Sequence, residues 1–240
     1  GDLNDMNHDI NETDYEEIYS VLEIINNNFN KTIFVMPGNH ESKEDYYKAL
    51  NLFDLTDLSD HNNLKFESMN ILSVPGYHLA DYTNPNGFLF DNVMDFHPMK
   101  DCLPEPEADC NQGLSLLVAH GPPKGTNANS IDAIVTEGTK SMEWNNVGNQ
   151  QINELILNKN INFGVFGHIH EAGMKAVDIK DEFVPENKWS TSLFLNPGPA
   201  TAWQMNNDDV NKGIFSKGSV AILKIDTENK KARYEIVKVE

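Results

Sequence analysis

Two histidines stand two positions apart, directly after an apolar run. The run is Phe163–Phe166, and Gly167 separates it from His168 and His170. On a helix, residues with this spacing point to nearly opposite sides, whereas on extended backbone they share one side, roughly 6.5 Å apart. Two imidazoles on one side can each hold one ion of a metal pair about 3.5–4 Å apart. The alternative interpretation is an exposed polar turn that contains histidines.

Three further segments place polar residues at the end of an apolar stretch or beside a glycine. Asp2 lies in the opening GDLND, the stretch IFVMPG is followed by Asn39, His40 and Glu41, and His120 ends LLVAH. Polar side chains at strand ends can converge on one crevice, which is where open α/β sheets bind ligands. Carboxylate and imidazole together suit Zn, Fe or Mn, and a set without sulfur argues against a structural zinc.

Hydrophobic spacing predicts the elements that must position these residues. Helices are predicted from Thr13 or Asp14 onward, over 42–50 behind Ser42, and after Asn149. Strands are predicted over 31–36 and 114–120 and within MNILSVPGYH and NFGVF. Four more strands are predicted in the last third, in MKAVDI, TSLFLNPG, GSVAILKID and KARYEIVKV.

This order of elements predicts an α/β fold in four layers. Strand and helix alternate in the first two-thirds, and a run of strands follows, which favours an α-β-β-α sandwich of two mixed sheets with helices outside. We expect a single domain over residues 1–240. The stretch 81–113 is expected to form a loop or cap over one face, because it is rich in proline, with Pro85, Pro98, Pro104 and Pro106.

Composition excludes several classes of protein. The formal net charge of −19 repels polyanions, so non-specific nucleic-acid binding is not expected. The chain has no run of 18 apolar residues, so no membrane span is expected. Cys102 and Cys110 could pair across a short loop, but two free thiols in a reducing compartment are the favoured interpretation, which predicts a cytoplasmic protein.

Four short blocks, GD-x-x-D, GNHE, AHGPP and GHIHE, occur in one order along the chain. In this order they resemble the calcineurin-like metallophosphoesterases over essentially the whole chain. The resemblance implies a phosphomonoesterase or phosphodiesterase that uses two divalent metal ions, such as Mn, Fe or Zn, on a small phosphate ester. Asp2 would bridge both ions, Asn39, His120 and His168 would complete the second metal site, and His170 would belong to the first.

The resemblance also implies catalytic roles. His40 would contact the substrate phosphate or protonate the leaving oxygen, and with Asn39 it would stabilise charge on the phosphoryl oxygens. A metal-bridging hydroxide would attack phosphorus in line. As alternatives, Asn39 could be a turn residue and His40 a helix cap. Asp5 is expected to be a turn residue, and Glu41 to lie beside the site.

The sequence departs from the family in one block. An Asp-x-His block that supplies two ligands to the first metal should precede GD, and it is absent here. The triplet Asp95-Phe96-His97 comes later, in the wrong order. We therefore expect that the sequence begins inside a longer protein and lacks two N-terminal strands. Met6 and Pro37 stand near places where the serine/threonine phosphatase branch carries arginine, so that branch is not expected.

Two other functions compete with ester hydrolysis. One is a non-catalytic scaffold on the same fold, like the retromer subunit of this superfamily, because fold alone does not fix function. The other is a DNA-processing nuclease, against which the acidic composition weighs. His78 and His97 lie outside the blocks and are interpreted as surface residues at the rim of the site.

Overall fold

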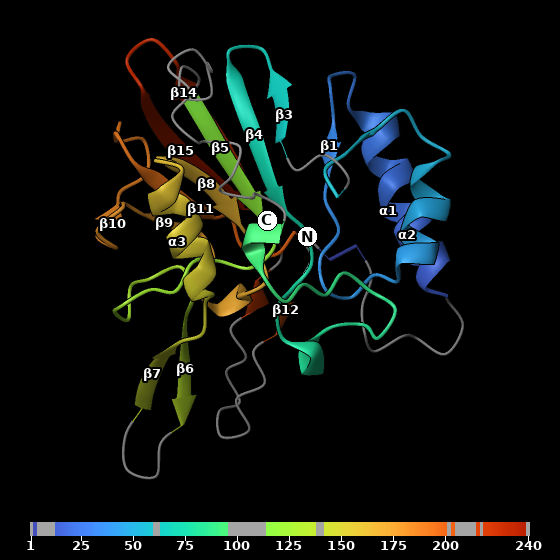
Figure 1. Ribbon diagram of the computed structural model, residues 1–240, viewed down its shortest axis with the longest axis horizontal. Helices are drawn as coiled ribbons and strands as arrows, with labels where there is room; N and C mark the ends of the chain where they lie inside the picture. Colours follow the sequence, from blue (N-terminus) through green and yellow to red (C-terminus); the bar gives the residue numbers. More distant parts are fainter. Residues whose placement is uncertain are drawn as a thin grey trace.

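The structure is a computed structural model that describes residues 2–3, 13–59, 63–95, 114–137, 142–200, 203–204, 215–216 and 218–238. Its largest element is a seven-stranded mixed sheet in the order β10-β9-β11-β8-β5-β4-β3 (Figure 1). The central strands β11, β8, β5 and β4 run parallel, and β9, β10 and β3 are antiparallel to their neighbours. The bounds are β3 Asn63–Phe66, β4 Met69–Val74, β5 Leu114–Ala119, β8 Phe163–Phe166, β9 Lys175–Val177, β10 Phe183–Val184 and β11 Leu193–Asn196.

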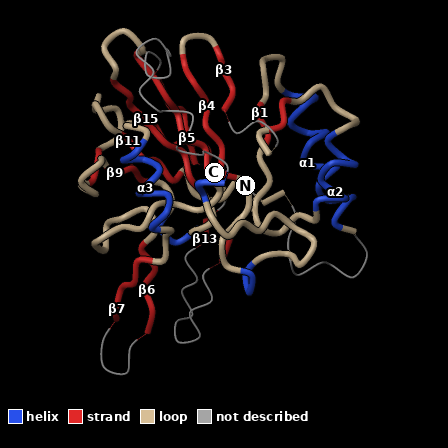
Figure 2. Tube along the Cα trace, in the orientation of Figure 1, coloured by secondary structure: helices blue, strands red, loops and turns tan. Residues whose placement is uncertain are grey.

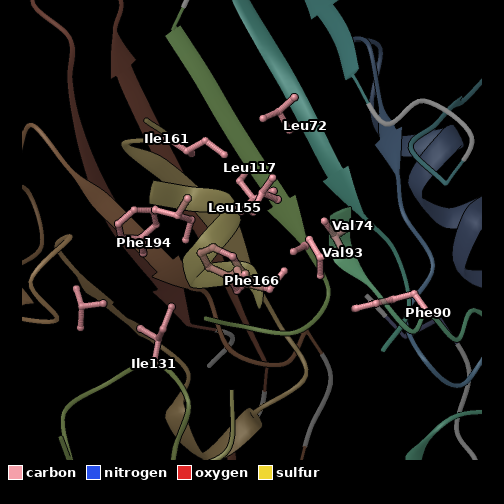
Figure 3. Packing of buried hydrophobic residues seen from close by; sticks show 14 residues of the cluster. Leu72, Val74, Phe90, Val93, Leu117, Ile131, Leu155, Ile161, Phe166 and Phe194 are labelled. Carbon is pink, nitrogen blue, oxygen red and sulfur yellow. The ribbon is translucent and has the colours of Figure 1, made fainter. Parts of the chain in front are cut away.

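Helix α3, Gln150–Asn158, covers one face of this sheet. Its first turn is capped by Asn149, whose side chain accepts a hydrogen bond from the backbone N–H of Gln151 at 2.8 Å, as predicted. The buried Leu155 of this helix belongs to one apolar cluster with Leu117 of β5 (Figure 3). This cluster is the core between the helix and the sheet.

The other face of the sheet carries a second layer of strands. Side chains alternate along β5, so that Leu117 faces α3 while Leu116 and Val118 face the second layer. A hairpin of β14, Ser219–Asp226, and β15, Lys231–Lys238, packs there. The same face also carries a parallel pair of two-residue strands, β1, Phe34–Val35, and β2, Thr56–Asp57.

Helices α1, Asp14–Asn28, and α2, Lys43–Leu50, form the outer layer beyond β1. Neighbouring residues of β1 point to opposite sides, because Phe34 packs towards the seven-stranded sheet and Val35 packs against the two helices. Figure 2 shows α1 and α2 on one side of the strands and α3 on the other. The predicted α-β-β-α arrangement is confirmed, and its second strand layer consists of two separate two-stranded pairs.

Helix α1 begins as the sequence predicts. Thr13 accepts a hydrogen bond from the backbone N–H of Glu16, and the Glu16 carboxylate accepts one from the backbone N–H of Thr13, which makes a capping box. Ser42 likewise caps α2 through the backbone N–H of Asp45. Local sequence therefore determines where these helices start.

Other elements differ from the expectation. The strand expected over 31–36 is reduced to the two residues of β1, because its partner β2 offers only two residues for pairing. The stretch 81–113 contains two short 3-10 helices, η1 and η2, while 96–113, with both cysteines and His97, lies outside the described residues. Strands that the sequence did not predict are β2, β3, β10, a hairpin of β6 and β7, and the pair β12 and β13. Their bounds, with those of the 3-10 helices, are β6 Ala133–Glu137, β7 Met142–Asn146, β12 Trp203–Gln204, β13 Phe215–Ser216, η1 Ala80–Tyr82 and η2 Val93–Asp95.

Crossing a bilayer requires a helix that is both long and apolar. Among the described residues, no helix combines the two properties to that degree.

Candidate metal centre

Two histidines meet where neighbouring parallel strands end. His120 directly follows β5 and His168 lies two residues after β8, and the backbone N–H of Gly167 donates to the carbonyl of His120 at 2.8 Å. The Nε2 atom of His120 lies 3.1 Å from Nδ1 of His168. Because β5 and β8 are parallel, their carboxyl ends deliver both imidazoles to the same point at the edge of the sheet.

Asn39 and Asp2 reach the same point from the second layer. Oδ1 of Asn39 lies 2.5 Å from Nε2 of His120 and 2.9 Å from Nδ1 of His168. Oδ1 of Asp2 lies 3.5 Å from the same His120 nitrogen. The ligand atoms of Asp2, His120 and His168 all lie within 4.8 Å of one another. The four side chains expected to converge are therefore together.

The loop that carries Asn39 is fitted to Asp2. A β-carbon at Gly38 would lie 2.0 Å from Oδ1 of Asp2, so only glycine leaves room for the carboxylate. The fully buried Glu41 accepts hydrogen bonds from the backbone N–H groups of Leu3 and Gly38. Glu41 lies beside the site, as expected. Its two hydrogen bonds link the segment that carries Asp2 to the loop that carries Asn39.

Two further residues orient Asn39, and sequence reasoning missed both. The backbone carbonyl of Tyr82 accepts a hydrogen bond from Nδ2 of Asn39, which turns Oδ1 towards the histidines. Asn84 donates from its backbone N–H to the carbonyl of Asn39 at 2.8 Å and from Nδ2 to the carbonyl of His40 at 2.9 Å. A backbone carbonyl leaves no mark in the sequence, although Asn84-Pro85 is a recognisable turn signal.

Asn196, at the end of β11, anchors the turn that carries His168. Its buried amide donates to the carbonyls of Ile169 at 2.9 Å and Ile131 at 3.2 Å. Asparagine followed by proline and glycine at a strand end resembles the pattern that singled out Asn39. That signal was present in TSLFLNPG and was interpreted only as a strand.

His40 and His170 lie at the margin of this group. Nε2 of His40 lies 3.9 Å from Oδ2 of Asp2, and a quarter of the His40 side chain is exposed. His170 begins the 3-10 helix η4, His170–Ala172, and does not belong to the group of ligand atoms within 4.8 Å. His168 has a φ of +65°, whereas Ile169, between the two histidines, is extended, with a φ of −90° and a ψ of 90°. That both imidazoles share one side stays a prediction.

Burial sets the charges of these groups. It lowers the pKa of His120 to about 3 and that of His168 to about 4, so both imidazoles are neutral near pH 7 and offer lone pairs. For Asp2, burial alone raises the pKa, but His120 and His40 lower it to about 2, so the carboxylate is ionised. Burial, and then the charge of Asp2, raises the pKa of Glu41 to about 7.

His78 is more enclosed than a surface residue. Burial lowers its pKa, and its Nδ1 atom is buried without a hydrogen-bond partner among the described residues. Its ring lies 4.4 Å, between centroids, from that of Tyr77. The side chain of His78 is nevertheless partly exposed, so its interpretation as a surface residue at the rim stays a prediction.

The four convergent side chains fit a divalent cation. A carboxylate oxygen, an amide oxygen and two imidazole nitrogens face one another, with three of their separations at 2.9–3.5 Å and one at 2.5 Å. Neighbouring ligands around one ion with bonds of about 2.0–2.2 Å have separations of this size. Such a set suits Mn, Fe or Zn. In the part of the chain that the structure describes, Asp2, His120 and His168 make up the one group of three or more histidine, cysteine or acidic side chains arranged in this way.

Comparisons with known proteins give structural similarities alone. No family model matches the chain, and no curated protein matches it. One solved crystal structure is 13% identical with a TM-score of 0.49, over 92% of this chain and 68% of its own. The crystal structure of TT1561 from Thermus thermophilus is 10% identical with a TM-score of 0.47, over 94% of this chain and 79% of its own. Neither similarity bears on what the site does.

Proposed function

We propose that this protein is a phosphoric ester hydrolase that depends on divalent metal ions. The observation that carries the proposal is the meeting of Asp2, Asn39, His120 and His168 at one point, with His40 beside them. The resemblance of the GD-x-x-D, GNHE, AHGPP and GHIHE blocks to the calcineurin-like metallophosphoesterases supports the same reaction class. A small phosphate monoester or diester is the proposed substrate.

We extend the proposal to two cations. Asp2, Asn39, His120 and His168 would hold one ion, and a second would share Asp2 and use His170, as the resemblance implies. The electrostatics favour a cation at this point, because the Asp2 carboxylate is ionised and the two imidazoles in the group are neutral. A cation that binds there meets one formal negative charge and no competing positive one within the group.

Each residue of the site has a separate part in the proposed reaction. Divalent cations, when bound, would supply positive charge opposite the phosphoryl oxygens and acidify water for use near neutral pH. Asn39 contributes its Oδ1 as a ligand, because its Nδ2 already donates to Tyr82. His40, partly exposed beside Asp2, donates a hydrogen bond to a phosphoryl oxygen or a proton to the leaving oxygen.

The test compares two aspartates with the same substitution. The protein, stripped with a chelator and reloaded with Mn²⁺, is assayed on p-nitrophenyl phosphate and bis-p-nitrophenyl phosphate. Asp2→Asn should lose both Mn²⁺ and hydrolysis, because it removes the one carboxylate of the group. Asp226→Asn, at the end of β14, is the matched control and should behave as wild type. Equal rates for the two variants would refute the proposal.

The second candidate function is a non-catalytic scaffold. It is favoured by one observation, that the described residues hold a single group of three or more such ligands, whereas two-metal hydrolysis uses two ions. A scaffold would bind Mn²⁺ at the same point yet hydrolyse neither ester. Metal content measured together with both rates separates the two candidates.

A further inference from the structure

Tyr77 is a buried aromatic residue next to the metal centre that the proposed mechanism does not use. It follows the Pro-Gly turn at the end of β4, and its side chain is almost wholly enclosed. Its backbone is fixed on both sides, because its N–H donates to the carbonyl of Phe88 at 2.9 Å and its carbonyl accepts from Phe90 at 3.2 Å. The ring therefore has little freedom to move away.

The ring of Tyr77 contacts both histidine-bearing loops. Its centroid lies 3.9 Å from that of the His168 imidazole, with the planes tilted by 37°. It also lies against Gly121, the residue after His120, where a β-carbon would stand 2.8 Å from Cε2 of the ring. The glycine of the AHGPP block thus leaves room for this tyrosine. One side chain therefore links the turn after β5 to the turn after β8.

The backbone conformation of His168 is one that requires support from neighbouring residues. Its φ of +65° is uncommon for a residue with a β-carbon, and conformations of this kind persist where surrounding contacts fix them. The described contacts of its imidazole are polar, to Asn39 and His120, and aromatic, to Tyr77 at 3.9 Å and to the His120 ring at 4.9 Å between centroids. The polar contacts define where Nδ1 lies, and the aromatic contact defines the plane of the ring.

We propose that Tyr77 is a positioning residue, whose aromatic ring holds the His168 imidazole in the orientation that directs Nδ1 at the metal centre. We assign this role to the aromatic ring and not to the hydroxyl, because the hydroxyl donates a long hydrogen bond of 3.4 Å to the carbonyl of Val147. The consequence for metal affinity rests on the proposed function. The orientation of His168 itself does not, and it can be measured in the metal-free protein.

The first measurement is the affinity for Co²⁺, followed by its visible absorption. Tyr77→Phe keeps the ring and should bind within about 3-fold of wild type, whereas Tyr77→Leu should bind about 10–100-fold more weakly, as when other supports of metal ligands are lost. Tyr234→Leu is the matched control, because Tyr234 is equally buried and its hydroxyl donates to a carbonyl far from the site. Equal affinities for Tyr77→Phe and Tyr77→Leu would overturn the proposal.

The second measurement uses the metal-free protein and needs no activity. The imidazole proton signals of His168, assigned by their loss in His168→Gln, should be shifted by the neighbouring ring in wild type and in Tyr77→Phe. In Tyr77→Leu they should move and broaden. Identical signals in the two Tyr77 variants would refute the role of the ring, whereas failure of wild type to bind Co²⁺ would refute the proposed function alone.

A second variant tests the same idea without altering Tyr77. Gly121→Ala adds a β-carbon 2.8 Å from the tyrosine ring and should displace it. The His168 signals should then shift in the same direction as in Tyr77→Leu, and Co²⁺ affinity should fall by a similar factor. Wild-type signals in Gly121→Ala, together with wild-type folding, would contradict the proposal that the Tyr77 ring between the two loops orients His168.

Discussion

Acid changes the stability of the folded state in opposite directions through Glu41 and through the buried histidines. The substitution Glu41→Gln in the metal-free protein removes one of these two opposing effects. Burial and then the charge of Asp2 raise the pKa of Glu41 from 4.5 to about 7. Burial lowers the pKa of His120 from 6.5 to about 3 and that of His168 to about 4. We predict that removing the Glu41 carboxyl makes the folded state more sensitive to acid.

The size of the effect follows from which state binds more protons. Between about pH 7.5 and about pH 5, the unfolded chain protonates both histidines and the folded chain does not, which costs ~4 kcal/mol of unfolding free energy. Over the same interval the folded chain takes up a proton at Glu41 and the unfolded chain hardly does, which returns ~2 kcal/mol. From these three groups alone, wild type should lose ~2 kcal/mol on acidification and Glu41→Gln ~4 kcal/mol, and the lowered pKa values of His78 and His170 add a further loss to both proteins.

Urea unfolding after chelator treatment, followed by circular dichroism, measures the free energy at both pH values. Glu235→Gln, at an exposed position of β15, is the matched control and should lose as much as wild type. If Glu41→Gln and Glu235→Gln lost the same stability on acidification, Glu41 would not be the group that takes up the proton, and the reasoning would fail.

Three further predictions concern the site. His40→Ala should leave Mn²⁺ content unchanged and lower turnover of bis-p-nitrophenyl phosphate about 10²–10⁴-fold, and unchanged turnover would remove His40 from the mechanism. Gly38→Ala places a β-carbon 2.0 Å from Oδ1 of Asp2, so Mn²⁺ affinity by calorimetry should fall at least ~10-fold; wild-type affinity would show that Asp2 can move aside. Asn196→Ala leaves buried carbonyls, among them that of Ile169, without a donor and should cost about 1–3 kcal/mol in urea unfolding, whereas no loss would mean that water replaces the amide.

Local sequence signals predicted most of the elements that carry the site. Capping residues such as Thr13 and Asn149 mark where helices begin, because their side chains satisfy backbone N–H groups of the first turn. Apolar runs marked β5 and β8, which are central strands of the sheet with apolar clusters on both faces. The hairpin of β6 and β7 was missed because its strands pair only with each other and carry no long apolar run.

The candidate ligand residues were predictable for a similar reason, and the residues that support them were not. Polar residues within a few positions of a strand end, such as Asn39 and His120, are visible in the sequence because the pattern repeats. Tyr82 acts through a backbone carbonyl, which any residue could supply, and Tyr77 acts through its contact with a residue 91 positions away. Such contacts depend on the tertiary arrangement, and no local spacing predicts them.

The centre joins the β1 side of the second layer to the seven-stranded sheet. Asp2 and Asn39 belong to the side of β1 and α1, whereas His120 and His168 belong to the seven-stranded sheet. Among the described residues, the core cluster between β1 and that sheet has three buried members, Met36, Leu58 and Ile71. An ion held by all four ligands would act as a cross-link between these layers. Amide hydrogens of α1 and α2 would then exchange with solvent more slowly in the metal-loaded protein, because the opening that releases these helices as one cooperative unit would first have to break the coordination.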